Sequence, residues 1–158
     1  MARNVAALGF AKLARKLNRF PAEVEKQVRA AMELAAEAVC NTARNLVPVD
    51  DGKLKKSIGW TWGEAPRGSI VLRLLKGSKK KNGGLTITIY AGDSEAFYAR
   101  WVEFGTAPHV NGGLFAGSAN PGTSAQPFFF PAYRANKKRA KSGIRRAITK
   151  AAKKIAAS

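Results

Sequence analysis

The sequence predicts an α+β fold, in which a small antiparallel sheet of three to four strands packs against a long N-terminal helix, with a short helix and a basic C-terminal helix beside them. Three observations lead to this prediction. Apolar residues recur at helical steps through residues 21–47, alternate with a period of two through 57–90, and return to helical steps after residue 95. Helices at both ends of a strand-rich stretch are typical of this class.

The length of the chain favours one domain. It has 158 residues, of which 46% are hydrophobic, and a chain of this size can bury a core of its own. No internal repeat is visible. We therefore expect a single domain over 1–158, with an N-terminal arm or short helix (1–20), a core (21–133) and a basic C-terminal helix (134–158).

Two helical patterns open the chain. Residues 6–18 carry leucines among basic residues, which is typical of a short amphipathic helix. Pro21 then opens a helix of about seven turns, since proline is tolerated at the first helical position. Pro48 ends it, because the residue before a proline is pushed out of the helical region. One apolar stripe runs along this helix: Val24, Val28, Met32, Ala35, Val39, Ala43 and Leu46.

A turn at 49–52 and a helical turn at 53–56, capped by an aspartate, separate this helix from three strands. The strands are expected over 57–62, 69–75 and 85–90. Short loops between them predict an antiparallel meander. Side chains alternate between the two faces of a strand. In the first expected strand, one face therefore carries Ile58, Trp60 and Trp62. In the third expected strand, one face carries Leu85, Ile87 and Ile89.

Helical spacing returns at 95–104, with Phe97, Trp101 and Phe104 on one face and Gly105 as a C-terminal stop. Residues 106–126 form a long loop rich in Gly, Ser, Asn and Pro; loops of this length are usually functional or disordered. The final helix is expected over roughly 131–156, with a narrow apolar stripe: Ile144, Ala147, Ile148, Ala151 and Ile155.

The net charge of +18 comes from 28 basic and 10 acidic residues and is concentrated towards the C-terminus. Residues 134–158 carry ten Lys or Arg and no acid. Such a field favours polyanionic or acidic partners. No motif for reading a base sequence is present, so any contact with nucleic acid would be sequence-independent. The candidate contacts with DNA or an acidic partner are Lys79, Lys80, Lys81, Lys137, Lys138, Arg139, Lys141, Arg145 and Arg146.

The titratable residues do not predict an enzyme. The single histidine, His109, lies in the glycine-rich loop, and the single cysteine, Cys40, lies in an apolar helical pattern. Asp50 and Asp51 are adjacent in a turn, where capping is the simpler role. We expect no catalytic, metal-binding or cofactor-binding residue, no cofactor and no small-molecule substrate.

No targeting segment is visible, and no stretch approaches the roughly 20 apolar residues that span a bilayer. The amphipathic stretch 137–157 has alanine and isoleucine on its apolar face without an aromatic residue, so we expect no membrane partner. We expect synthesis as a soluble protein in the cytoplasm.

Three segments, in order, carry a family resemblance: ARNLVPVDDGKLKKSI (43–58), YARWVEFGT (98–106) and AQPFFFPA (125–132). Their order and spacing resemble the HK97 gp10-like family, which comprises tail components, neck proteins and tail-completion proteins of tailed bacteriophages. The resemblance spans roughly residues 20–140. It departs from the family pattern at Asp51, where threonine is usual, and in the longer loop 106–126. The basic C-terminal helix extends beyond it.

The resemblance implies a structural protein of the virion that joins a DNA-filled head to a tail at the head–tail junction, as a neck, tail-completion or tail-terminator-type ring. It also implies a homo-oligomeric ring, a hexamer, with other neck and tail proteins and the packaged DNA as partners. The alternative is a free basic protein that binds nucleic acid non-specifically. Residues expected at oligomer or partner interfaces are Trp101, Glu103, Phe104, Thr106, Phe128, Phe129 and Phe130. Glu103 is also expected to pair with an arginine such as Arg100.

Overall fold

The computed structural model describes residues 22–73 and 86–156 of the chain. The expected helix over 6–18 and the basic loop over 77–84, with Lys79, Lys80 and Lys81, lie outside the described residues. The elements in order are α2 (Ala22–Leu46), α3 (Lys53–Lys56), β1 (Gly59–Trp62), β2 (Ile70–Arg73), β3 (Ile87–Ala91), α4 (Ala99–Phe104), β4 (His109–Val110), the 3₁₀ helix η1 (Gly113–Phe115), β5 (Ala119–Asn120) and α5 (Phe129–Ala156).

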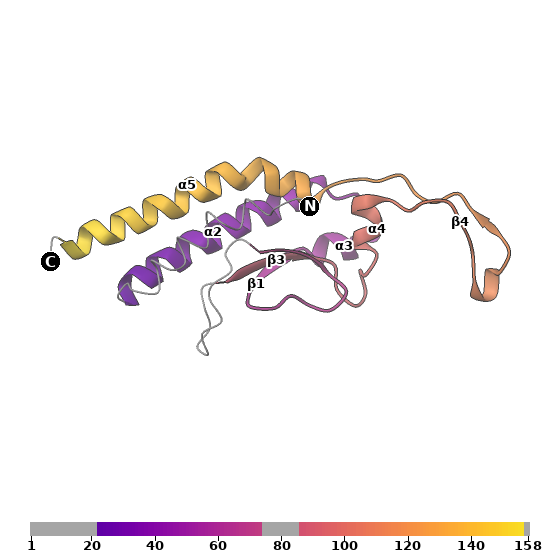
Figure 1. Cartoon of the computed structure of the whole chain (residues 1–158), viewed down its shortest axis with the longest axis horizontal. Coiled ribbons are helices and arrows are strands. Elements are labelled where there is room, and N and C mark those ends of the chain that lie inside the picture. Colours follow the sequence, from indigo (N-terminus) through magenta and orange to yellow (C-terminus); the bar gives the residue numbers. More distant parts are fainter. Residues whose placement is uncertain (1–21, 74–85, 157–158) are drawn as a thin grey trace, which may run out of the picture.

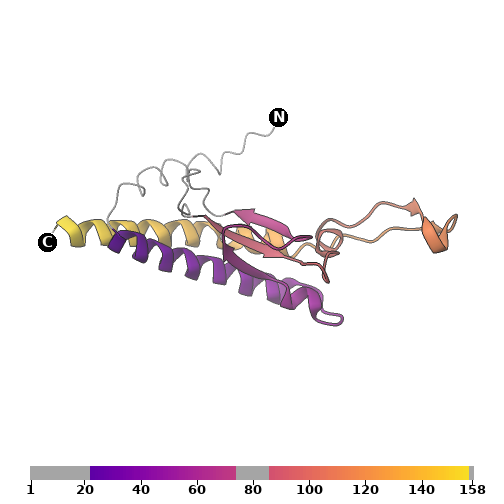
Figure 2. The same ribbon diagram turned by 90° about the horizontal axis from the view of Figure 1, so that it is seen from below.

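The fold is α+β, as predicted. The long helix α2 packs along α5 on one side and against β1 and β3 on the other (Figure 1). The two helices run in opposite directions, and the thin segment that carries β4 and β5 extends away from them (Figure 2). The body is therefore built around α2, which contacts α5, β1 and β3.

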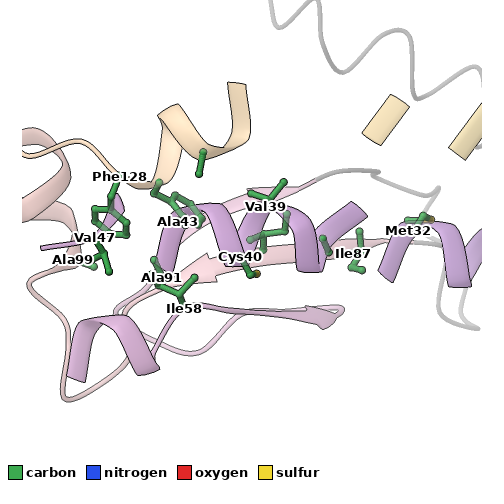
Figure 3. Packing of buried hydrophobic residues seen from close by; sticks show 14 of the residues in the cluster. Met32, Val39, Cys40, Ala43, Val47, Ile58, Ile87, Ala91, Ala99 and Phe128 are labelled. Atoms are coloured by element: carbon green, nitrogen blue, oxygen red, sulfur yellow. The ribbon is translucent and has the colours of Figure 1, made fainter. Parts of the chain in front are cut away.

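The predicted apolar stripe of α2 forms the core. Val28, Met32 and Val39 are fully buried and belong to one cluster with side chains of the sheet and of α5. Figure 3 shows Met32 and Val39 in this cluster. The prediction is wrong at the end of the stripe, where Leu46 is half exposed and Val47 is buried. Val47 continues the four-residue step from Ala43 through its backbone N–H bond to the Ala43 carbonyl, which turns it inward.

The three strands are antiparallel, but the predicted meander is wrong. β3 lies in the centre, between β1 and β2, so the sheet order is β1-β3-β2. β3 buries Ile87 and Ile89 on the face towards α2, and its Thr88 on the opposite face is also buried, where its hydroxyl donates to the Gly63 carbonyl. β3 is buried at four of its five residues, and the central position hydrogen-bonds both its edges.

Acidic side chains of α2 fasten the helix to the edge of the sheet. The indole N–H of Trp60 donates to Glu37 Oε2 at 2.9 Å, and that of Trp62 donates to Glu33 Oε1 at 3.0 Å. Arg44 also bonds to Glu37, at 2.8 Å. These contacts place the predicted face of β1, with Trp60 and Trp62, towards α2.

The short turns and helix ends follow local hydrogen bonding. The expected aspartate cap of α3 is wrong, because the N-cap residue is Gly52; Asp51, one residue earlier, accepts the N–H of Lys53 at 2.9 Å. α4 begins at residue 99 rather than 95, because Asp93 takes the N–H groups of Glu95 and Ala96 in a turn that precedes the helix. α5 begins at residue 129, two residues earlier than predicted, since the missing N–H of Pro131 costs nothing in a first turn.

Candidate interaction surfaces

Glu103 sits in the interior and caps a helix. Its side chain is 3% exposed, and it accepts three backbone N–H groups, from Phe128 and Phe129 at 2.8 Å and from Phe130 at 3.1 Å. The expected pairing with Arg100 is therefore wrong: Arg100 is exposed, and the carboxylate is held by the start of α5. A carboxylate is favourable there because the first N–H groups of a helix have no partner within it and carry a partial positive charge.

The neighbouring phenylalanines point mainly inward. Phe128 and Phe129 are fully buried in the core, whereas Phe130 is partly buried and its ring centroid lies 5.7 Å from that of Phe104. Within one molecule, Phe128, Phe129 and Glu103 thus join α4 to α5. Their expected place at an interface stays a prediction.

Three aromatic side chains of and before α4 face solvent, and we call Phe97, Trp101 and Phe104 the aromatic ledge. They are 54%, 50% and 57% exposed. Phe97 and Trp101 meet edge to face, with ring centroids 5.5 Å apart. Three large aromatic residues exposed on one short segment are unusual for a surface, and such patches commonly mark sites of association.

Residues 106–126, expected as a loop, form a hairpin that we call the arm. Thr106 and Thr123 exchange two backbone hydrogen bonds at its base, and β4 pairs with β5 further out. The arm projects away from the body on the side opposite the C-terminal end of α5 in both views (Figures 1 and 2). At its end Leu114 and Phe115, the arm tip, are 99% and 73% exposed.

An open pocket of about 800 Å³ lies where the arm leaves the body, and we call it the arm-base pocket. Tyr98, Trp101 and Val102 form its apolar side, and Thr106 and Gln126 contribute polar groups. None of its lining residues is a Lys, Arg, Asp or Glu. The pocket therefore suits an apolar or neutral group rather than an ion.

Helix α5 presents a basic face. Nine of its cations have described side chains, and none forms an ion pair with an acidic side chain of the described ranges. Arg145, Arg146, Lys150 and Lys153 line one shallow hollow. The nine are Arg134, Lys137, Lys138, Arg139, Lys141, Arg145, Arg146, Lys150 and Lys153.

The residues with reactive side chains lie apart. Cys40 is buried, and burial raises the pKa of its thiol to about 12, so it stays protonated at neutral pH. His109 is exposed on the arm, where its Nδ1 lies 3.0 Å from the Ala107 carbonyl oxygen. Over residues 22–73 and 86–156, no three His, Cys, Asp or Glu side chains form a group that could hold a metal ion. Among the helices of these ranges, none combines the length and apolarity needed to cross a membrane.

Comparison with known families decides the identity. The family model described as "Bacteriophage HK97-gp10, putative tail-component" matches residues 11–105. The chain belongs to this family of bacteriophage tail components. No curated protein and no solved structure matches it.

Within this HK97-gp10-like tail component, the matched range contains the core helix, the sheet and α4. Two of the three motif segments, 43–58 and all but the last residue of 98–106, lie inside the match. The third, 125–132, lies beyond it, together with the whole arm and the basic helix. The arm and the basic face of α5 thus lie outside the matched range, whereas the aromatic ledge lies inside it.

Two features of the structure, the arm and the role of Glu103, were not predicted from the sequence. The arm gave no periodic signal, although the neutrality of 106–126 in a chain with 24% charged residues could have set it apart. The role of Glu103 depends on a contact 25 residues along the chain, which spacing within α4 does not reveal. The basic face of α5, by contrast, was evident from composition alone.

Proposed function

We propose that this tail component is a structural subunit of the phage head–tail junction, a neck, tail-completion or tail-terminator-type ring that joins the DNA-filled head to the tail. The observation that carries the proposal is the division of its surface into an uncharged arm beside an exposed aromatic ledge, and a basic face on α5. A junction subunit needs both kinds of surface, one for neighbouring proteins and one for DNA or an acidic ring.

A ring follows from the symmetry of the particle. A tail is rotationally symmetric, and subunits that repeat around its axis are most stable when their contacts close. A hexamer is the proposed state. The proposed contacts with neighbouring copies and with other neck and tail proteins include Trp101, Phe104 and Thr106 on the exposed side, whereas Glu103, Phe128 and Phe129 support them from within.

The basic face has two proposed partners. It can face DNA that passes through the lumen of the junction, or it can dock onto an acidic ring above or below. The nine described cations without acidic partners on α5 support either arrangement. Lys79, Lys80 and Lys81 belong to the same proposal on sequence grounds.

Quantitative mass spectrometry of purified particles tests the proposed place. The copy number of this chain is measured relative to the major capsid protein. We expect about one ring of copies, on the order of six per particle. Hundreds of copies would instead indicate a tail-tube or capsid role and contradict the junction.

The second candidate, a free protein that binds nucleic acid non-specifically, is favoured by the same basic helix. It predicts that intact particles lack the chain while the lysate contains it in abundance. It also predicts that an isolated monomer binds duplex DNA at physiological salt.

A further inference from the structure

The arm tip is an ordered apolar surface with nothing beneath it. Leu114 and Phe115 extend into solvent, yet the backbone around them is held by its own hydrogen bonds. The N–H of Asn111 donates to the Ser118 carbonyl at 2.9 Å, and the Ser118 hydroxyl donates to the Phe115 carbonyl at 2.7 Å. A surface already fixed in shape loses little freedom on docking, which favours binding.

The arm tip cannot fill the arm-base pocket of its own molecule. The pairs Thr106 with Thr123, His109 with Asn120 and Val110 with Ala119 keep the two strands of the arm extended. The arm-base pocket is lined partly by these same residues, among them Thr106 and Asn120. Folding the tip back would break the pairing that forms the pocket, so a tip that docks there must belong to another copy of the chain.

The charge distribution of the chain indicates which kind of partner suits the arm tip. Copies of a chain with a net charge of +18 repel each other, and only neutral parts of their surfaces can approach without that cost. Residues 106–126 contain no Lys, Arg, Asp or Glu, and the arm-base pocket contains none either. An acidic partner would be drawn to α5 instead. The neutral tip and the neutral pocket therefore match each other.

From these observations we infer that Leu114 and Phe115 of one copy dock into the arm-base pocket of a second copy, against Tyr98, Trp101 and Val102. The pocket, of about 800 Å³, lies in the range that holds compact apolar ligands. Tip and pocket are different surfaces of one chain, so the contact is head-to-tail and can repeat around an axis until it closes. The inference rests on the proposed function, because it names the contact that would close the ring.

Crosslinking between two variants of the full chain, each with one added cysteine, tests the contact. Leu114→Cys places a thiol on the tip, and Ser124→Cys places one in the pocket. The native Cys40 is present in every variant and is buried, so we expect it to contribute no crosslink. The variants are mixed with a short bismaleimide at about 0.5 M salt, which screens the repulsion between copies. The control pair is Leu34→Cys with Ser124→Cys, because Leu34 is an equally apolar, exposed residue of α2.

We expect about tenfold more crosslinked dimer from the tip–pocket pair than from the control pair, because docking holds the two thiols at a high effective concentration. A yield no higher than that of the control pair overturns the inference. A double variant, Leu114→Ser with Phe115→Ser, should also reduce self-association in sedimentation, with an unchanged circular dichroism spectrum. Self-association equal to that of the unaltered chain overturns it as well.

The copy number in particles distinguishes a failure of this inference from a failure of the proposed function. If crosslinking fails while particles hold about one ring of the chain, the junction role stands and the arm contact is wrong. If crosslinking succeeds but particles lack the chain, the arm contact stands and the junction role is wrong.

Discussion

At the scale of single residues, Glu103 links two parts of the chain that are distant in sequence. Its carboxylate accepts the N–H groups of Phe128, Phe129 and Phe130. We expect Glu103→Ala to lower the free energy of unfolding by about 2–4 kcal/mol, because the donors of a buried helix start lose a charged acceptor. Urea denaturation measures the change.

Glu95→Ala is the matched control for Glu103→Ala. It removes the same charge from an exposed position in the turn before α4. We expect this control to change the free energy of unfolding by no more than about 0.5 kcal/mol. Equal effects of the two variants would mean that net charge, and not the cap on α5, governs the stability.

Glu37 gives the stability a dependence on pH. Hydrogen bonds from Trp60 and Arg44 hold the pKa of Glu37 below its usual value of 4.5. The unfolded chain therefore binds this proton more readily. The stabilisation is fully present above the unfolded pKa and is lost as the pH falls through the folded one. Because the side chain is 45% exposed, solvent screening keeps the effect below about 1 kcal/mol.

Glu37→Gln should consequently be less stable than the unaltered chain at pH 7, with the difference shrinking below about pH 4. Urea denaturation at both pH values measures it. Trp60→Phe, which removes the indole donor, should weaken the same pH dependence. A difference that stays constant with pH would show that the contacts of Glu37 do not depend on its charge.

At the scale of elements, the arm depends on Gly122, which adopts a φ of +77°. A Cβ at this position would collide with the carbonyl oxygen of Thr106 and lie 2.9 Å from the carbonyl carbon of Ala107. We expect Gly122→Ala to open the base of the arm. A local strain of about 1–3 kcal/mol corresponds to about five- to 150-fold faster amide exchange at Thr106 and Thr123.

Gly112→Ala provides the control for the arm. Gly112 has an extended backbone with a φ of −105°, and nothing lies within 4 Å of the position of its Cβ. We expect unchanged exchange in this variant. We also expect the core amides of β3 to keep their protection in both variants, because no residue of the arm belongs to the core. Loss of protection in β3 would mean that the arm and the body unfold together.

The elements that were predictable from the sequence are those whose patterns are local. The four-residue steps of α2, the alternation in β1 and β3 and the basic stripe of α5 are each visible within one segment. The strand order was not predictable, because it depends on which strand is buried most in the centre of the sheet. The arm was not predictable either. Its pairing forms between Thr106 and Thr123, which are far apart in the sequence and carry no periodic signal.

At the scale of the whole molecule, the salt dependence of DNA binding can distinguish the two proposed partners of the basic face, DNA and an acidic protein ring. Each phosphate that a cation neutralises makes the DNA-binding constant more sensitive to salt, with a slope of about −0.9 per contact in a double-logarithmic plot. If α5 faces DNA, replacing Arg145, Arg146 and Lys150 with Gln should weaken binding and flatten the slope by about 2 to 3. Binding to a short duplex at several salt concentrations measures both.

The matched control replaces Lys55, Lys56 and Arg100 with Gln, which lowers the net charge equally but changes exposed cations of α3 and α4. If α5 binds DNA directly, this control keeps the slope of the unaltered chain. Equal flattening in both variants would mean that the overall field, and not one helix face, attracts the duplex. If α5 instead docks onto an acidic ring, the α5 variant keeps its DNA slope while particles fail to assemble, because the cations are then needed by a protein neighbour and DNA passes without touching them.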